Sequence, residues 1–140
     1  MRRPLVILLL LLAPLLAAAE SIAVVVNPDS GVTALSRNEV INIFLGSFRQ
    51  LPSGRVASPI DLPAGHPARA AFYRRLVGKS PAEINTYWAR LVFSARTRPP
   101  IEAERVEDAL SLVQGSAAAI TYLERSQVSG RLRVVFELAD

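Results

Sequence analysis

Residues 5–16 form the longest apolar segment of the chain, with Arg2 and Arg3 before it and three alanines, 17–19, after it. A basic start, a short apolar core and small residues before a cleavage point are the pattern of a secretory signal peptide. The apolar segment is shorter than the roughly 20 residues that cross a bilayer, so a retained membrane anchor is the weaker alternative. We therefore expect cleavage near Ala19, a mature form without a membrane span, and a periplasmic or secreted protein.

Four short runs in residues 20–140 are typical of β-strands. The first, 22–26, is a continuous apolar run rich in β-branched residues, and it ends in the turn sequence N-P-D-S-G, as a buried strand does. The same kind of pattern predicts three further strands, at 56–60, 117–121 and 132–136.

Three helices are predicted by the residues at their ends. S-R-N-E at 36–39 and S-P-A-E at 80–83 are capping boxes, in which the serine and glutamate side chains each bind a free backbone N–H. Pro67 suits the first turn of a helix, and Gly46 and Gly78 are natural helix ends. Apolar residues at helical spacing follow each of these starts.

A fourth helix is predicted over 106–113, where apolar residues recur at helical spacing. Glu102 and Glu104 precede it and suit the positive end of its dipole. A loop at 96–100 comes before them. The resulting order, β-α-β-α-α-α-β-β, favours a single α/β domain over residues 20–140, with a small mixed sheet flanked by helices in three layers.

The apolar face of the helix that starts near residue 81 carries the only tryptophan of the chain. Trp88 shares this face with Ile84, Tyr87, Leu91 and Val92, at the spacing of a helix that packs on a core. We expect Tyr87 and Trp88 to be core residues. The alternative is an exposed aromatic platform on which a ligand stacks.

Composition excludes several kinds of chemistry. The chain has no cysteine, so it forms no disulfide and no thiolate site, and His66 is its only histidine, so no histidine pair can hold a metal. Nucleophile, phosphate-loop and dinucleotide motifs are absent. The net charge of +4 is scattered and forms no basic patch for nucleic acid. We expect no enzyme, no metal, no cofactor and no nucleic-acid partner; catalysis centred on His66 is the enzymatic alternative.

Two loops carry the candidate ligand site: Ser30 with Gly31, and Gly65 with His66 and Arg69. Both loops follow predicted strands and precede helices, so we expect their free N–H groups to face one crevice, the usual anion site of α/β folds. Arg69 lies in a first helical turn, where the helix dipole disfavours a cation. An anionic ligand or an acidic side chain would neutralise it there; a solvated or ion-paired surface arginine is the alternative.

Five motifs occur in an order that resembles the phosphate-binding proteins of ABC transporters. They are A-V-V-V-N at 23–27, I-F-L-G at 43–46, P-I at 59–60, F-Y at 72–73 and A-A-I-T-Y at 118–122. Together they are similar to the second lobe of this family, a type 2 periplasmic-binding-protein-like domain, and to short secreted versions of that lobe. The resemblance implies a domain outside the cytoplasm that binds phosphate or another oxyanion and works with an ABC permease.

The chain departs from the family pattern where that family holds its oxyanion, with an arginine at the end of the second strand and a Ser-Gly-Thr at the next helix start. Residues 61–69 read D-L-P-A-G-H-P-A-R here, and Thr121 replaces the glycine of an Ile-Gly-Tyr motif. A single lobe also leaves one side of a ligand in water, where hydrogen bonds lose most of their net value. We therefore expect weak oxyanion binding, strengthened at low pH by a positive charge on His66. The alternative is a non-enzymatic module that docks another envelope protein in the same crevice.

If residues 1–19 are a cleaved signal peptide, the mature protein starts at Glu20 or Ser21. The intact mass of the exported protein checks this expectation, and a mass that retains Met1 would contradict it. Ala19→Arg places a large cation directly before the cut, so this variant should keep the full precursor mass.

Overall fold

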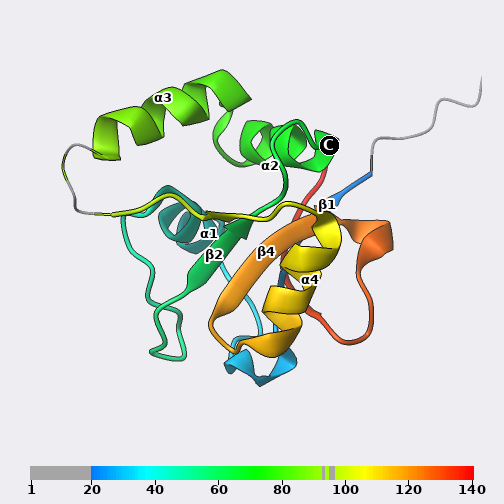
Figure 1. The fold of residues 1–140 in the computed structure, drawn as a ribbon. Coiled ribbons are helices and arrows are strands. Elements are labelled where there is room, and N and C mark those ends of the chain that lie inside the picture. The colour runs from blue at the N-terminus through cyan, green and yellow to red at the C-terminus, as the bar shows by residue number, and fades with distance from the viewer. Residues whose placement is uncertain (1–19, 93, 95–96) are drawn as a thin grey trace, which may run out of the picture.

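The computed structural model describes residues 20–92, 94 and 97–140; the predicted signal peptide at 1–19 and residue 96 of the predicted loop lie outside the described residues. Figure 1 shows the fold. In chain order its elements are β1 (Ile22–Val26), α1 (Arg37–Leu45), β2 (Ser58–Asp61), α2 (Pro67–Val77), α3 (Pro81–Val92), β3 (Ile101–Glu102), α4 (Val106–Gly115), β4 (Ala119–Glu124) and β5 (Arg133–Leu138). Short 3-10 turns, Pro28–Ser30 and Arg125–Gln127, follow β1 and β4.

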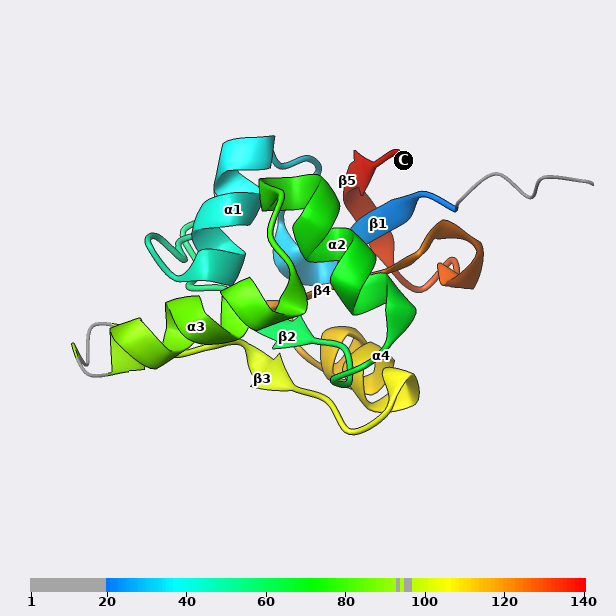
Figure 2. The ribbon, with the colours of Figure 1, turned by 90° about the horizontal axis from the view of Figure 1, so that it is seen from above.

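The strands form one mixed sheet in the order β3-β2-β4-β1-β5 (Figure 2 labels all five). β2 runs parallel to both of its neighbours, β3 and β4, whereas β1 runs antiparallel to β4 and β5. The carboxyl ends of β2 and β4 therefore lie at one end of the sheet, and the carboxyl end of β1 lies at the other. This arrangement decides which loops can share a site.

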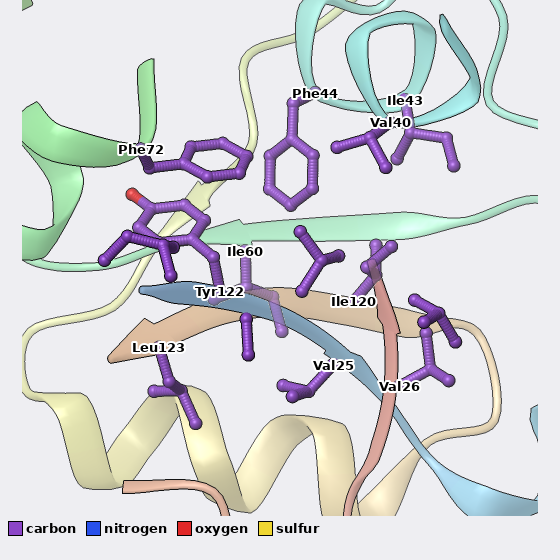
Figure 3. Packing of buried hydrophobic residues seen from close by; sticks show 14 of the residues in the cluster. Val25, Val26, Val40, Ile43, Phe44, Ile60, Phe72, Ile120, Tyr122 and Leu123 are labelled. Carbon is purple, nitrogen blue, oxygen red and sulfur yellow. The ribbon is translucent and has the colours of Figure 1, made fainter. Parts of the chain in front are cut away.

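Helices cover both faces of the sheet, which confirms the predicted three-layer α/β architecture. α1 and α2 lie on one face, and α4 packs on the other face against β4 and β1 (Figure 2). α3 packs against α2. Figure 3 shows Phe44 of α1 and Phe72 of α2 pointing onto the sheet, while Leu123 of β4 points the opposite way, toward α4.

Stacked aromatic side chains join α1 and α2 to the central strand β4. The rings of Phe72 and Tyr122 lie nearly parallel with centroids 3.9 Å apart, and Phe44 meets Phe72 edge-on at 4.9 Å (Figure 3). All three side chains are fully buried. Such pairs add stability beyond the burial of apolar area. The core therefore fixes the ring of Tyr122, whose hydroxyl reaches the polar site described below.

The capping residues predicted from the sequence are present. Ser36 accepts a hydrogen bond from the N–H of Glu39, and the Glu39 carboxylate accepts one from the N–H of Ser36. Ser80 and Glu83 form the same reciprocal pair at the start of α3. Gly46 follows α1 in the left-handed region, at φ +79°. The predicted helix starts and the end of α1 are thus confirmed.

The predicted bounds of three strands need correction. Each strand begins one or two residues later than predicted, because apolar loop residues precede it, and ends one to three residues later, because polar residues belong to its last part. β2 covers 58–61 rather than 56–60, β4 covers 119–124 rather than 117–121, and β5 covers 133–138 rather than 132–136.

The edge strand β3 was not predicted at all, since two residues after two prolines show no alternation. Glu102 consequently lies in a strand rather than at a helix start. The acids in the first turn of α4 are Glu107 and Asp108.

Trp88 lies in the core as predicted, with 7% of its surface exposed. Its ring packs so close to Gly46 that an added Cβ there would lie 3.0 Å from the ring atom Cη2. The guanidinium of Arg49 lies 6.0 Å from the ring centroid. The neighbouring Tyr87 is half-buried and donates its hydroxyl to the carbonyl of Leu45 at 2.6 Å. The exposed-platform alternative is wrong for Trp88.

Trp88→Ala should lower the free energy of unfolding by about 3–5 kcal/mol, because a buried tryptophan leaves a large cavity. Denaturant unfolding measures this change. Phe48→Ala is the matched control, since Phe48 is 58% exposed and its loss should cost less than about 0.5 kcal/mol. Equal effects of the two substitutions would contradict the core position of Trp88.

Candidate ligand-binding site

The candidate site lies where the loop after β2 enters α2. Gly65 adopts φ +83°, a left-handed conformation that turns the loop toward the helix. His66 is the N-cap of α2, and its Nδ1 accepts a hydrogen bond from the N–H of Ala68 at 3.1 Å. Pro67 occupies the first helical position, where no N–H is needed. The sequence G-H-P thus starts the helix and places Arg69 in its first turn.

A buried carboxylate, Asp61, ends β2 directly before this loop. Its Oδ1 accepts hydrogen bonds from the hydroxyls of Tyr73 in α2, at 2.7 Å, and of Tyr122 in β4, at 2.8 Å. The hydroxyl of Tyr122 also accepts the N–H of Leu62 at 3.2 Å. Hydrogen bonding of this kind compensates a polar group for the loss of water. Asp61 thereby connects β2, α2 and β4.

Burial sets the proton affinities of this cluster. Loss of water raises the pKa of Asp61, although hydrogen bonds from Tyr73 and Tyr122 and the charge of Arg69 oppose the change. Burial, together with the nearby charge of Asp61, also raises the pKa values of Tyr73 and Tyr122 well above their ordinary value. Both tyrosines therefore stay protonated and act as hydrogen-bond donors.

Arg69 is held by one carbonyl and two carboxylates. Its Nη1 donates to the carbonyl of Leu62 at 3.0 Å and lies 3.3 Å from Oε2 of Glu102 in β3. Its Nη2 lies 3.9 Å from Oδ2 of Asp61. The side chain of Arg69 is 16% exposed, that of Asp61 5% and that of Glu102 55%. The acidic neutralisation expected for Arg69 is thus present, and this arginine is ion-paired.

Three of the five predicted site residues line one pocket. Gly65, His66 and Arg69 surround a cavity of about 370 Å³, together with Glu102 and the α3 residue Asn85. Glu102 is the more exposed of the two carboxylates that contact Arg69. The pocket therefore offers one guanidinium, one imidazole and one carboxylate to a ligand.

Ser30 and Gly31 do not belong to this pocket. They follow β1, which runs antiparallel to β4, so they lie at the end of the sheet opposite to Gly65. Ser30 is buried, and its Oγ accepts the N–H of Val32 at 3.1 Å. Gly31 adopts φ +78° in the same turn. The expectation that the two loops share one crevice is corrected by the strand directions.

Four members of the site were not predicted from the sequence: Asp61, Tyr73, Glu102 and Tyr122. An acidic residue directly after a buried strand was the available signal for Asp61. The two tyrosines stand among apolar residues at core spacing, and their hydroxyls carry no signal of their own. Glu102 becomes a partner of Arg69 only through the parallel pairing of β3 with β2.

The described part of the chain contains no group of three or more histidine, cysteine, aspartate or glutamate side chains that could hold a metal ion. Among the same residues, no helix is both long and apolar enough to cross a membrane.

The mixed sheet with helices on both faces is similar to part of three larger solved structures. A provisionally assigned phosphate ABC transporter substrate-binding protein from Clostridium perfringens, solved with bound phosphate, gives a TM-score of 0.65 at 20% identity, over 84% of this chain and 45% of that chain. An ABC-type phosphate transport receptor from Vibrio cholerae gives 0.66 at 16% identity, over 84% and 46%. A provisionally assigned phosphate-binding protein from Planctomyces limnophilus gives 0.58 at 14% identity, over 84% and 41%.

The chain spans less than half the length of each of these proteins. At such low identities the likeness establishes the fold alone, since one fold supports many functions. No protein-family model matches the chain, and no curated protein matches it. The resemblance noted in the sequence is thus confirmed at the level of the fold.

The raised pKa of Asp61 predicts a specific pH dependence of stability. The folded protein keeps a proton on Asp61 at pH values where the unfolded chain has released it, so the stabilisation is present at low pH and is lost as pH rises through the raised pKa. We expect the stability of the wild type relative to Asp61→Asn to fall as the pH rises above about 4, the ordinary pKa of an aspartate, and through the raised pKa of Asp61. Thermal unfolding of both proteins across this range measures the difference. A difference that grows with pH would mean that Arg69 and the tyrosines outweigh burial.

Proposed function

We propose that this chain is a non-enzymatic binding domain outside the cytoplasm that holds oxyanions weakly in the pocket beside Arg69. The observation that carries the proposal is the position of Arg69: its guanidinium lines a pocket at the carboxyl end of β2, next to the start of α2. Ligands of open α/β sheets bind at such strand ends. The phosphate-binding descriptions of the three structural neighbours support an oxyanion as the ligand class.

Arg69 supplies the main attraction for an anion. A guanidinium can hold an oxyanion with two parallel hydrogen bonds, a geometry that lysine does not offer. The start of α2 adds the positive end of its dipole. Its N–H groups contribute little, because His66 already accepts the N–H of Ala68 and the N–H of Arg69 bonds to the carbonyl of His66.

Two features of the site keep the proposed affinity low. Arg69 already contacts the carboxylates of Asp61 and Glu102, so an incoming anion meets like charges beside the one cation. The pocket is open, and water competes there for every hydrogen bond. We therefore expect dissociation constants on the order of millimolar, about 4 kcal/mol of binding free energy.

The hydrogen bond between His66 and Ala68 changes the role that we propose for the His66 side chain. Because Nδ1 accepts the N–H of Ala68, the neutral ring carries its proton on Nε2 and can donate one hydrogen bond to a ligand. A proton on Nδ1 would remove the cap of α2.

The compartment and the transport partner belong to the same proposal. The basic start, apolar core and alanines of residues 1–19 support export, and the transport descriptions of two of the neighbours support an ABC permease as a partner.

A second candidate function is a docking module for another envelope protein. It is favoured by apolar side chains that project into solvent, Ile101 on the edge strand β3 at 55% exposure and Phe48 in the loop after α1 at 58%. Protein interfaces, unlike anion sites, need such apolar anchors at their centre. Capture of an envelope protein that is lost on Ile101→Asp and unaffected by Arg69→Ala would favour this second function.

Sulfate is the cleaner probe of the first function, since its charge is constant near neutral pH. In a chemical-shift titration at constant ionic strength, the mature protein should bind sulfate at millimolar concentrations, and Arg69→Ala should abolish the binding. Arg98→Ala is the matched control, because Arg98 is exposed and lies outside the pocket lining.

Arg69→Ala leaves Asp61 without its guanidinium, so Arg69→Lys is measured beside it as a variant that retains the charge. It should bind more weakly than the wild type. Equal loss in Arg69→Ala and Arg98→Ala would reduce the binding to nonspecific charge attraction and overturn the proposal.

A further inference from the structure

The two carboxylates that contact Arg69 do so at different nitrogens, Glu102 at Nη1 and Asp61 at Nη2. Asp61 belongs to the buried end of β2, is tied to two tyrosine hydroxyls and does not line the pocket. Glu102 lines the pocket together with Arg69 and is more than half exposed. Of the two carboxylates, Glu102 is therefore the one that shares the pocket with Arg69.

We propose that Glu102 is an internal competitor for the ligand: its carboxylate occupies, at Arg69, the place that an oxyanion would take. This inference rests on the proposed oxyanion function of the pocket. A carboxylate presents two oxygens to a guanidinium much as sulfate and phosphate do, so the chain supplies its own substitute for the ligand. An oxyanion then binds by displacing Glu102 from Nη1.

The backbone around Glu102 is fixed independently of this contact. β3 pairs with β2 in parallel register, Ile101 opposite Ile60 and Glu102 opposite Asp61, and the N–H of Ala103 donates to the carbonyl of Asp61 at 2.9 Å. The side chain of Glu102 can therefore swing away from Arg69 while the strand stays in place. Its fixed origin beside Arg69 gives the carboxylate a high local concentration, as a tether does.

The contact is strong enough to compete and weak enough to be displaced. An ion pair with one exposed partner contributes little to stability, since water screens it. The Glu102 carboxylate also repels an anion about 4 Å away. In water this repulsion is about as large as the stabilisation that the Arg69–Glu102 ion pair provides. Removing the charge of Glu102 removes both the competitor and the repulsion, and we expect sulfate to bind about tenfold more tightly as a result.

The test compares sulfate titrations of the wild type, Glu102→Gln and Glu104→Gln. Glutamine keeps the size of the side chain and removes its charge. Glu104 is the matched control, because it is an exposed acid two residues away that does not line the pocket. Chemical shifts of the Arg69 side chain report occupancy at the guanidinium itself. We expect the gain of about tenfold in Glu102→Gln, less than twofold in Glu104→Gln, and no binding in Glu102→Gln combined with Arg69→Ala.

The outcomes separate this inference from the proposed function. If the wild type and Glu102→Gln bind sulfate equally and both depend on Arg69, the internal competitor is disproved while the oxyanion function stands. If only Glu102→Gln binds, the competitor is supported and the wild type is not an oxyanion-binding protein. If neither binds at tens of millimolar, both proposals are wrong.

Discussion

The buried carboxylate of Asp61 is the constraint on which the candidate site depends. It ends β2 and accepts hydrogen bonds from tyrosine hydroxyls of α2 and β4. It also faces the guanidinium of Arg69, which contacts Glu102 of β3. Burying a carboxylate without such partners would cost much of the free energy of folding. The need for these partners therefore fixes the positions of α2, β3 and β4 relative to β2. The hydroxyls of Tyr73 and Tyr122 sit at the edge of the aromatic core, so core packing and site geometry are one arrangement.

Local features of this fold were predictable from the sequence, and long-range ones were not. The capping serines at 36 and 80 act through residues three positions away, so their signals are complete within one turn. The direction of β1 depends on which strand pairs with it, and no local pattern specifies that. Because β1 is antiparallel to β4, Ser30 and Gly31 lie far from Gly65 although all three follow strands. The edge strand β3 is defined only by its pairing with β2.

In the candidate site, too, local features were predictable from the sequence and long-range contacts were not. Arg69 was recognisable because a cation in the first turn of a helix opposes the dipole and requires a negative partner. The sequence left open whether that partner is a ligand or an acidic side chain. Its two acidic partners come from β2 and β3, and the second of them lies 33 residues further along the chain than Arg69, beyond the reach of any spacing rule. Tyr73 and Tyr122 were visible as core residues, but the roles of their hydroxyls appear only with the buried carboxylate.

The charge at the end of β2 decides where the guanidinium of Arg69 lies. The family that the sequence resembles has an arginine there, whereas this chain has Asp61 and carries its arginine in the following helix. A buried acid at the strand end attracts the guanidinium of Arg69 toward the core and leaves its outer side to Glu102. Among the described residues, Asp61 accepts hydrogen bonds from two tyrosines, whereas the Glu102 carboxylate contacts only the guanidinium of Arg69. In the proposed function, Glu102 is therefore the carboxylate that gives way to an anion. In the proposed function, the exposed carboxylate of Glu102 therefore sets the affinity of the pocket for an anion, while the buried carboxylate of Asp61 stays in place.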